Sequence, residues 1–115
     1  MRIGIFDSGL GGLTAVRELE LRRPDAGYVY FGDTARVPYG GRSKEVLDRY
    51  AVQDSRFLIS KKVDAIMVAC CTVSANCLDT LENTFDIPFY GVIEPAVRAA
   101  AQIASAGNGK IAVLC

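Results

Sequence analysis

Histidine is absent from this chain of 115 residues, and its absence excludes several kinds of site within it. Without histidine the chain forms neither a Ser-His nor a Cys-His catalytic pair, and it lacks the commonest zinc ligand. Acid–base chemistry must therefore fall to cysteine or carboxylate side chains. A second domain or subunit could supply a histidine, so the exclusion covers only these residues.

Net charge and long apolar runs are lacking as well. Thirteen basic and thirteen acidic residues balance, and no run of lysine or arginine would follow a phosphate backbone, so we expect no nucleic-acid partner. No apolar segment is long enough to span a membrane, and residues 1–6 form a strand pattern rather than a signal peptide. We therefore expect a cytoplasmic protein without a membrane partner, folded as one domain.

The four cysteines, at positions 70, 71, 77 and 115, match neither a zinc site nor a secreted disulfide scaffold. They lack C-x-x-C spacing and they are few, so we expect free thiols and no metal site. A redox role for the adjacent pair Cys70-Cys71 is a weaker alternative, because adjacent cysteines form a strained bridge and no C-x-x-C opens the following helix.

Short apolar runs alternate with helical patterns along the whole chain. The expected strands lie within residues 2–6, 28–31, 66–69, 87–93 and 110–115. This alternation predicts the α/β class, with three α/β/α layers around an open, mainly parallel, flavodoxin-like sheet of five strands. Because residues 111–115 end on an apolar strand pattern with no turn or helix after it, we expect the chain to be one half of a larger protein.

The stretch Val68-Ala69-Cys70-Cys71-Thr72-Val73-Ser74 joins an apolar strand to a helical pattern. Cys70 then lies at a strand's carboxyl end, where open α/β sheets bind ligands, and the following helix N-terminus favours a thiolate. Thr72 and Ser74 are placed to cap or open this helix. From position alone, an acid/base role and packing as a small hydrophobe both stay open for Cys70, whereas packing is favoured for Cys77.

Two loops follow the first two expected strands. The glycines of Asp7-Ser8-Gly9-Leu10-Gly11-Gly12 permit a tight turn before a helix whose N-terminus suits an anion. A plain turn with Asp7 capping the helix is the simpler alternative to a nucleotide site, because the full G-x-G-x-x-G spacing is missing. In residues 32–41, Pro38 and Gly40-Gly41 allow Tyr39 to be held out as a contact, or its ring packs on the loop.

Four motifs, in this order and spacing, resemble the N-terminal half of the glutamate racemase family over the whole chain. They are Asp7-Ser8-Gly9 with Gly11-Gly12, Pro38-Tyr39-Gly40, Ala69-Cys70-x-Thr72, and Gly91-Val92-Ile93-Glu94-Pro95. Aspartate racemases resemble them less closely. The resemblance implies a cofactor-independent enzyme of two similar α/β domains that interconverts L- and D-glutamate for peptidoglycan synthesis, and hence for cell-wall biogenesis and cell shape. Residues 1–115 would be its N-terminal domain, with the C-terminal domain absent.

The resemblance also implies residue roles. Cys70 resembles the family's acid/base cysteine, and Asp7 resembles the carboxylate beside that thiol, which also contacts substrate. The residues that resemble those holding the substrate's carboxylate and amino groups are Ser8, Tyr39, Gly40 and Thr72. Cys71 stands where the family's Cys-Asn-Thr motif has asparagine. A thiol is a poor hydrogen-bonding replacement for an amide in contact with substrate.

The family's opposing cysteine and its neighbouring histidine lie in the second domain. We therefore expect the chain alone to be inactive, because no residue in it is placed on the face of the substrate opposite Cys70. The alternatives are a non-catalytic racemase-like domain that binds small anions or a protein partner, and an aspartate racemase-like enzyme. An unpaired strand edge at residues 111–114 would favour self-association into a homo-oligomer.

Overall fold

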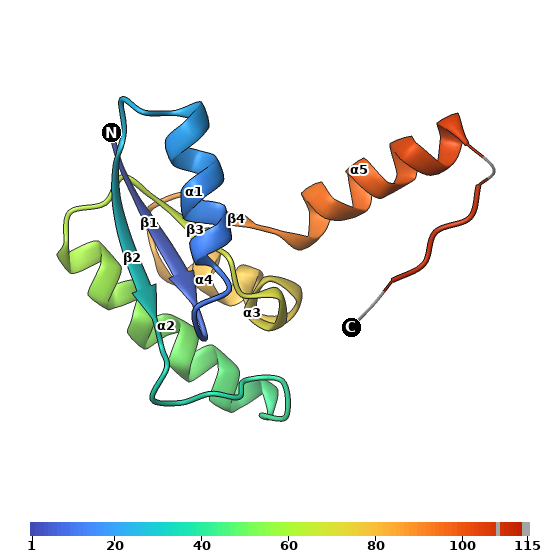
Figure 1. Cartoon of the computed structure of the whole chain (residues 1–115). Coiled ribbons are helices and arrows are strands. Elements are labelled where there is room, and N and C mark those ends of the chain that lie inside the picture. The colour runs from blue at the N-terminus through green and yellow to red at the C-terminus, as the bar shows by residue number, and fades with distance from the viewer. Residues whose placement is uncertain (108, 114–115) are drawn as a thin grey trace.

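The computed structural model describes residues 1–107 and 109–113, and it contains a parallel sheet with helices on both faces (Figure 1). The strands are β1 (Arg2–Asp7), β2 (Gly27–Gly32), β3 (Ala65–Val68) and β4 (Phe89–Gly91). The helices are α1 (Leu13–Arg22), α2 (Lys44–Ser60), α3 (Cys71–Asn76), α4 (Leu78–Thr84) and α5 (Ile93–Ala106). The predicted α/β class is confirmed.

The sheet has the strand order β2-β1-β3-β4, and every neighbouring pair is parallel. All carboxyl ends therefore lie at one edge of the sheet. The prediction of a fifth strand is wrong for its described part, because residues 110–113 have no strand conformation, while Leu114 and Cys115 lie outside the described residues. Helix α5 extends away from the sheet (Figure 1). Residues 110–113 follow α5 and therefore do not reach the free edge of β4.

The main core lies on the face of the sheet that α2 and α4 cover. Alternate strand residues Phe6, Ile66 and Val68 are fully buried there and pack with Leu58 of α2 and Leu81 of α4. Among the described helices, α1 covers the opposite face (Figure 1), and it has no fully buried residue. Beside α1 this face has a hollow of about 320 Å³, whose lining includes Ile3, Met67 and Tyr90. One face is thus well packed and the other is partly open.

The helix expected after residue 70 is divided into α3 and α4, with Cys77 at the junction. Ser74 does not cap α3. Its hydroxyl donates to the Val68 carbonyl at 2.7 Å and accepts from the Val92 N–H at 3.2 Å, so it ties the end of β3 to the chain after β4. Ser43, in contrast, is the N-cap of α2 as expected, and its Oγ accepts from the Val46 N–H at 3.4 Å.

As Figure 1 shows, helix α5 extends away from the sheet. It has no buried residue, and Val97 and Ile103 are exposed. A groove of about 610 Å³ lies between α5, β4 and the α3–α4 segment. Within residues 1–107 and 109–113, no helix is long and apolar enough to cross a membrane.

Candidate functional site

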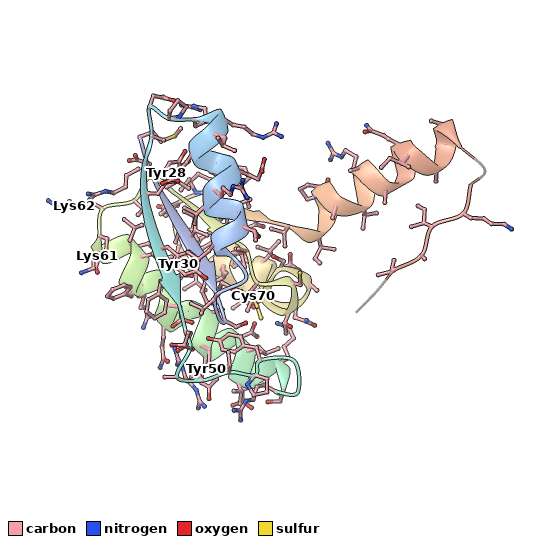
Figure 2. All side chains as sticks on the ribbon, in the orientation of Figure 1. Tyr28, Tyr30, Tyr50, Lys61, Lys62 and Cys70 are labelled. Carbon is pink, nitrogen blue, oxygen red and sulfur yellow. The ribbon has the colours of Figure 1, made fainter. Side chains whose placement is uncertain are left out.

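Cys70 lies at the carboxyl edge of the sheet as predicted, where it is the N-cap residue of α3 (Figure 2). Its backbone is extended, and the side chain is 4% exposed. The thiol donates to Ser8 Oγ across 3.5 Å. The Ala69 N–H donates to the Phe6 carbonyl at 2.8 Å, so β1 and β3 run side by side up to Asp7 and Cys70. The structure therefore brings Asp7, Ser8 and Cys70 together from two strand ends.

The carboxylate of Asp7 is buried and held by backbone N–H groups. Oδ1 accepts from Ser8 N at 2.9 Å, and Oδ2 accepts from Gly12 N, the N-cap residue of α1, also at 2.9 Å. The predicted link between Asp7 and the start of this helix is thus present. Tyr30 of β2 adds a contact that the sequence did not suggest: its hydroxyl lies 3.4 Å from Asp7 Oδ2 and donates to the Gly9 carbonyl at 2.6 Å. Burial, with the nearby Asp7 charge, raises the pKa of Tyr30 to about 12.

Glycine is required at two positions where the loops meet. A Cβ at Gly12 would lie 2.9 Å from Asp7 Cβ and 3.0 Å from Ala69 Cβ. A Cβ at Gly32 would lie only 2.2 Å from the Gly9 carbonyl oxygen. The glycine-rich loop after β1 therefore serves close backbone packing around Asp7.

The loop of residues 33–43, between β2 and α2, forms a third wall of the site. It begins beside Asp7, because the Asp33 N–H donates to the Asp7 carbonyl at 2.9 Å. Further along, a Cβ at Gly40 would lie 4.0 Å from Thr72 Oγ1. Gly40 and Cys71 are exposed, whereas Ser8 and Thr72 are half-buried. Five of the residues predicted to hold substrate, Asp7, Ser8, Gly40, Cys71 and Thr72, thus come from three loops at one edge.

Of the two alternatives for Tyr39, a ring held out as a contact and a packed ring, the structure shows the packed ring. Its side chain is 2% exposed and packs against Phe6 and Tyr50, with ring centroids 6.3 and 5.5 Å away. The ring is thus packed inward, because the Tyr39 hydroxyl finds partners inside the core. Substrate contact at Tyr39 stays a prediction.

The partners of the Tyr39 hydroxyl form a buried polar cluster that the sequence analysis missed. They are Asp33, at the start of the loop, and Asp54 of α2, which Arg36 bridges. Burial raises the pKa of Asp54 to about 6, and the Asp33 charge acts in the same direction, while hydrogen bonds from Tyr39 and Arg36 oppose the shift. A signal was available, because Leu47, Ala51, Asp54 and Leu58 recur at helical spacing on the buried face of α2.

The remaining described cysteines have separate environments. Cys77 is fully buried, as its helical spacing suggested, and burial, together with the neighbouring Asp48 carboxylate, raises its pKa to about 12. Cys70, Cys71 and Cys77 are all free thiols, as expected, and Cys115 lies outside the described residues. Across residues 1–107 and 109–113, no three histidine, cysteine, aspartate or glutamate side chains gather as candidate metal ligands.

No protein-family model matches the chain, but individual proteins do. It is 48% identical over 114 residues to the glutamate racemase of Persephonella marina, an overlap of 99% of this chain and 43% of that protein. The glutamate racemase of Aquifex pyrophilus is likewise 48% identical over 114 residues, which cover 99% of this chain and 44% of the relative.

Solved structures agree with these relatives. The structure of the Aquifex pyrophilus glutamate racemase superposes with a TM-score of 0.87 at 50% identity, covering 89% of this chain and 40% of that one. That of the Francisella tularensis enzyme in complex with D-glutamate gives 0.81 at 41% identity, covering 88% and 39%. In sequence and in fold, the chain is similar to glutamate racemases, and it spans about two-fifths of the length of the relatives it matches.

Proposed function

We propose that this chain is the N-terminal domain of a cofactor-independent glutamate racemase, and that Cys70 transfers the α-proton on one face of the substrate. The observation that carries the proposal is the position of the Cys70 thiol, 3.5 Å from Ser8 Oγ at the edge where three loops meet. The similarity to glutamate racemases supports the choice of reaction. Parallel α/β sheets bind ligands at this edge, which supports the choice of site.

Racemisation needs one proton acceptor and one proton donor on opposite faces of the α-carbon. The Cys70 thiolate takes the α-proton and becomes a thiol, while a second thiol returns a proton to the other face and becomes a thiolate. In the reverse direction the two groups exchange roles. Cys71 adjoins Cys70 and Cys77 is buried, so neither suits the second role. We assign that role to a C-terminal domain, which the greater length of the relatives supports.

Substrate binding falls to the polar edge around Cys70. Glutamate carries two carboxylates and an ammonium group, so its site needs fixed donors and one acceptor. In the proposal, the Ser8 and Thr72 hydroxyls and the exposed backbone at Gly40 hold a carboxylate, while Asp7 fixes the loop and contributes negative charge near the ammonium group. The product would be D-glutamate made in the cytoplasm for peptidoglycan.

A chimera tests this function. Residues 1–107 would be joined to the remainder of the Aquifex pyrophilus glutamate racemase, and conversion of L- to D-glutamate would be followed by circular dichroism. We expect turnover, and a loss of about 10³-fold in kcat in Cys70→Ala, the scale of one general acid–base group. Cys77→Ala is the matched control, because it removes a thiol that lies in the core.

Three outcomes would contradict the proposal. Cys70→Ala with kcat equal to that of Cys77→Ala would remove Cys70 from the reaction. A folded chimera that binds glutamate without turnover would favour the non-catalytic alternative. A preference for aspartate would favour an aspartate racemase-like enzyme.

A further inference from the structure

The polar cluster under the loop of residues 33–43 is built from four side chains. The Tyr39 hydroxyl lies within hydrogen-bonding distance of Asp33 Oδ2 and, at 2.8 Å, of Asp54 Oδ2. Arg36 donates through Nε to Asp33 Oδ2 and through Nη2 to Asp54 Oδ1 at 2.6 Å. These groups are buried from solvent, with exposed fractions of 5% for Asp33, 2% for Tyr39 and 2% for Asp54. Their hydrogen-bond donors must therefore come from within the cluster.

When both carboxyl groups are ionised, the cluster has one hydrogen-bond donor too few for its close oxygen–oxygen contacts. The Tyr39 hydroxyl has a single proton, yet its oxygen faces two carboxylate oxygens. If Asp54 is protonated, its Oδ2–H donates to Tyr39 Oη, and the Tyr39 O–H donates to Asp33. Every contact then has a donor. The charges of Asp33 and Arg36 also cancel, so the buried cluster is neutral.

Other charged groups do not replace this proton. Arg36 already uses Nη1 on Gln53, at 2.6 Å, and its guanidinium stacks 4.1 Å from the centre of the Tyr50 ring. Arg49 lies on the same ring, 5.7 Å from its centre. The groups whose charges act on Asp54 are Asp33 and Arg36, and the pKa of Asp54 is raised to about 6.

The same cluster fixes the loop that forms one wall of the candidate site. Asp33 is joined to Asp7 by a backbone hydrogen bond of 2.9 Å, and Tyr39 directly precedes Gly40, which faces Thr72. Asp54 belongs to α2 and not to the loop, so it provides a fixed point outside the segment that it holds.

We propose that Asp54 is a positioning residue for the candidate site. It holds Tyr39 and Arg36, and through them it holds Gly40 beside Thr72. It does so in its protonated form, in which the carboxyl group donates to Tyr39 Oη; we call this proton the shared proton. The positioning role rests on the proposed function, whereas the shared proton is tested without it.

Nuclear magnetic resonance of the 115-residue chain between pH 4.5 and 7.5 provides the test. We expect the Asp54 carboxyl carbon and the Gly40 amide to shift together, with a midpoint near pH 6. Asp54→Asn should abolish the Gly40 titration, because an amide N–H₂ donates to Tyr39 Oη without losing a proton. Asp48→Asn is the matched control on the same helix, and it should keep the midpoint.

Contacts between Gly40 and Thr72 give the second readout. Nuclear Overhauser effects between these residues should persist in Asp54→Asn and disappear in Asp54→Ala, where neither donor nor acceptor remains. If Asp54→Asn keeps the Gly40–Thr72 contacts and Asp54→Ala loses them, the contacts depend on hydrogen bonding by the residue at position 54 and not on its charge. A Gly40 titration in Asp54→Asn like that of the native chain, or contacts retained in Asp54→Ala, would overturn the inference. A chimera without racemase activity would refute the proposed function and leave the shared proton standing.

Discussion

Two parts of the same sheet edge are held in opposite ways. The loops after β1 and β3, which carry Ser8 and Cys70, are fixed by backbone N–H groups on Asp7 and by close packing at Gly12. The loop after β2 is fixed by a buried cluster of charged and hydroxyl side chains that reaches down to Asp54 on α2. In the first part the contacts come from backbone N–H groups, and Ser8 stays half-buried beside the buried Cys70, whereas in the second part the polar side chains that hold the loop are themselves buried.

The difference shows two ways of holding one sheet edge. Under the proposed function Ser8 and Cys70 contact substrate, and the backbone hydrogen bonds to Asp7 hold the loop after β1 without using either of these side chains. The loop of residues 33–43 follows β2, which has no buried residue. This loop is held by the buried charges of Asp33, Arg36 and Asp54, which are stable there only because each is paired. The predictions below set one part against the other.

Removing the cation of the cluster should have the largest effect. Arg36→Ala leaves Asp33 and Asp54 buried without a counter-charge. Breaking a buried ion pair costs about 3–5 kcal/mol of unfolding free energy. Because Arg36 is 28% exposed, we expect a loss near the lower of these values. Arg49→Ala removes an exposed arginine of α2 that lies on the same Tyr50 ring as Arg36, and it should cost under about 1 kcal/mol. Urea unfolding at pH 7 measures both, and equal losses would show that the cluster does not hold the loop.

The pH dependence of stability should distinguish Asp54 from Asp48. Because the folded-state pKa of Asp54 is raised to about 6 from 3.8, the folded chain binds this proton more tightly than the unfolded chain. Its contribution to stability is present below about pH 4 and is lost as pH rises to about 6, a change of about 3 kcal/mol. The difference in unfolding free energy between the native chain and Asp54→Asn should follow this curve.

Asp48 provides the control for this measurement. Its pKa is lowered, by hydrogen bonds from Lys44, Cys77 and Thr80 that outweigh its partial burial, so its contribution should grow as pH rises through the acid range. The comparison between the native chain and Asp48→Asn should therefore have the opposite slope. Parallel curves for the two variants would contradict the assignment of the raised pKa to Asp54.

A smaller effect is expected from the first part of the edge. Gly12→Ala places a methyl group 2.9 Å from Asp7 Cβ and 3.0 Å from Ala69 Cβ, so it should destabilise the chain by about 1–3 kcal/mol. Gly41→Ala meets no atom within 4 Å and should change stability little. Thermal unfolding of the two variants measures the difference, and a harmless Gly12→Ala would mean that the backbone around Asp7 is not tightly packed.

The sequence predicted those features that depend on neighbours along the chain. Strands β1, β2, β3 and β4, the Ser43 cap and the placement of Cys70 at a strand end all follow from local patterns. The division between α3 and α4 did not, because apolar spacing continues through Cys77. A fifth strand was expected from residues 110–115, but strand formation requires a partner edge, and residues 110–113 lie beyond α5.

The residues of the candidate site show the same limit. Asp7 and Ser8 follow from the pattern at the end of β1 and are in contact, and Gly40 lies near Thr72. The burial of Tyr39 depends on Asp54, which is 15 residues away on another element. No local rule pairs these two residues, although an aspartate on the apolar face of α2 indicates that a buried partner exists.

The central claim, that Cys70 transfers protons on one face of glutamate, is tested most directly by isotope exchange in the chimera. In deuterated water, exchange of the α-proton would be measured by nuclear magnetic resonance, starting separately from L- and D-glutamate, for the unmodified chimera and for Cys70→Ser. Because Cys70 serves one face only, we expect the substitution to abolish exchange from one enantiomer and to leave measurable exchange, without racemisation, from the other. Equal slowing from both enantiomers, or exchange unchanged from both, would contradict the assignment of Cys70.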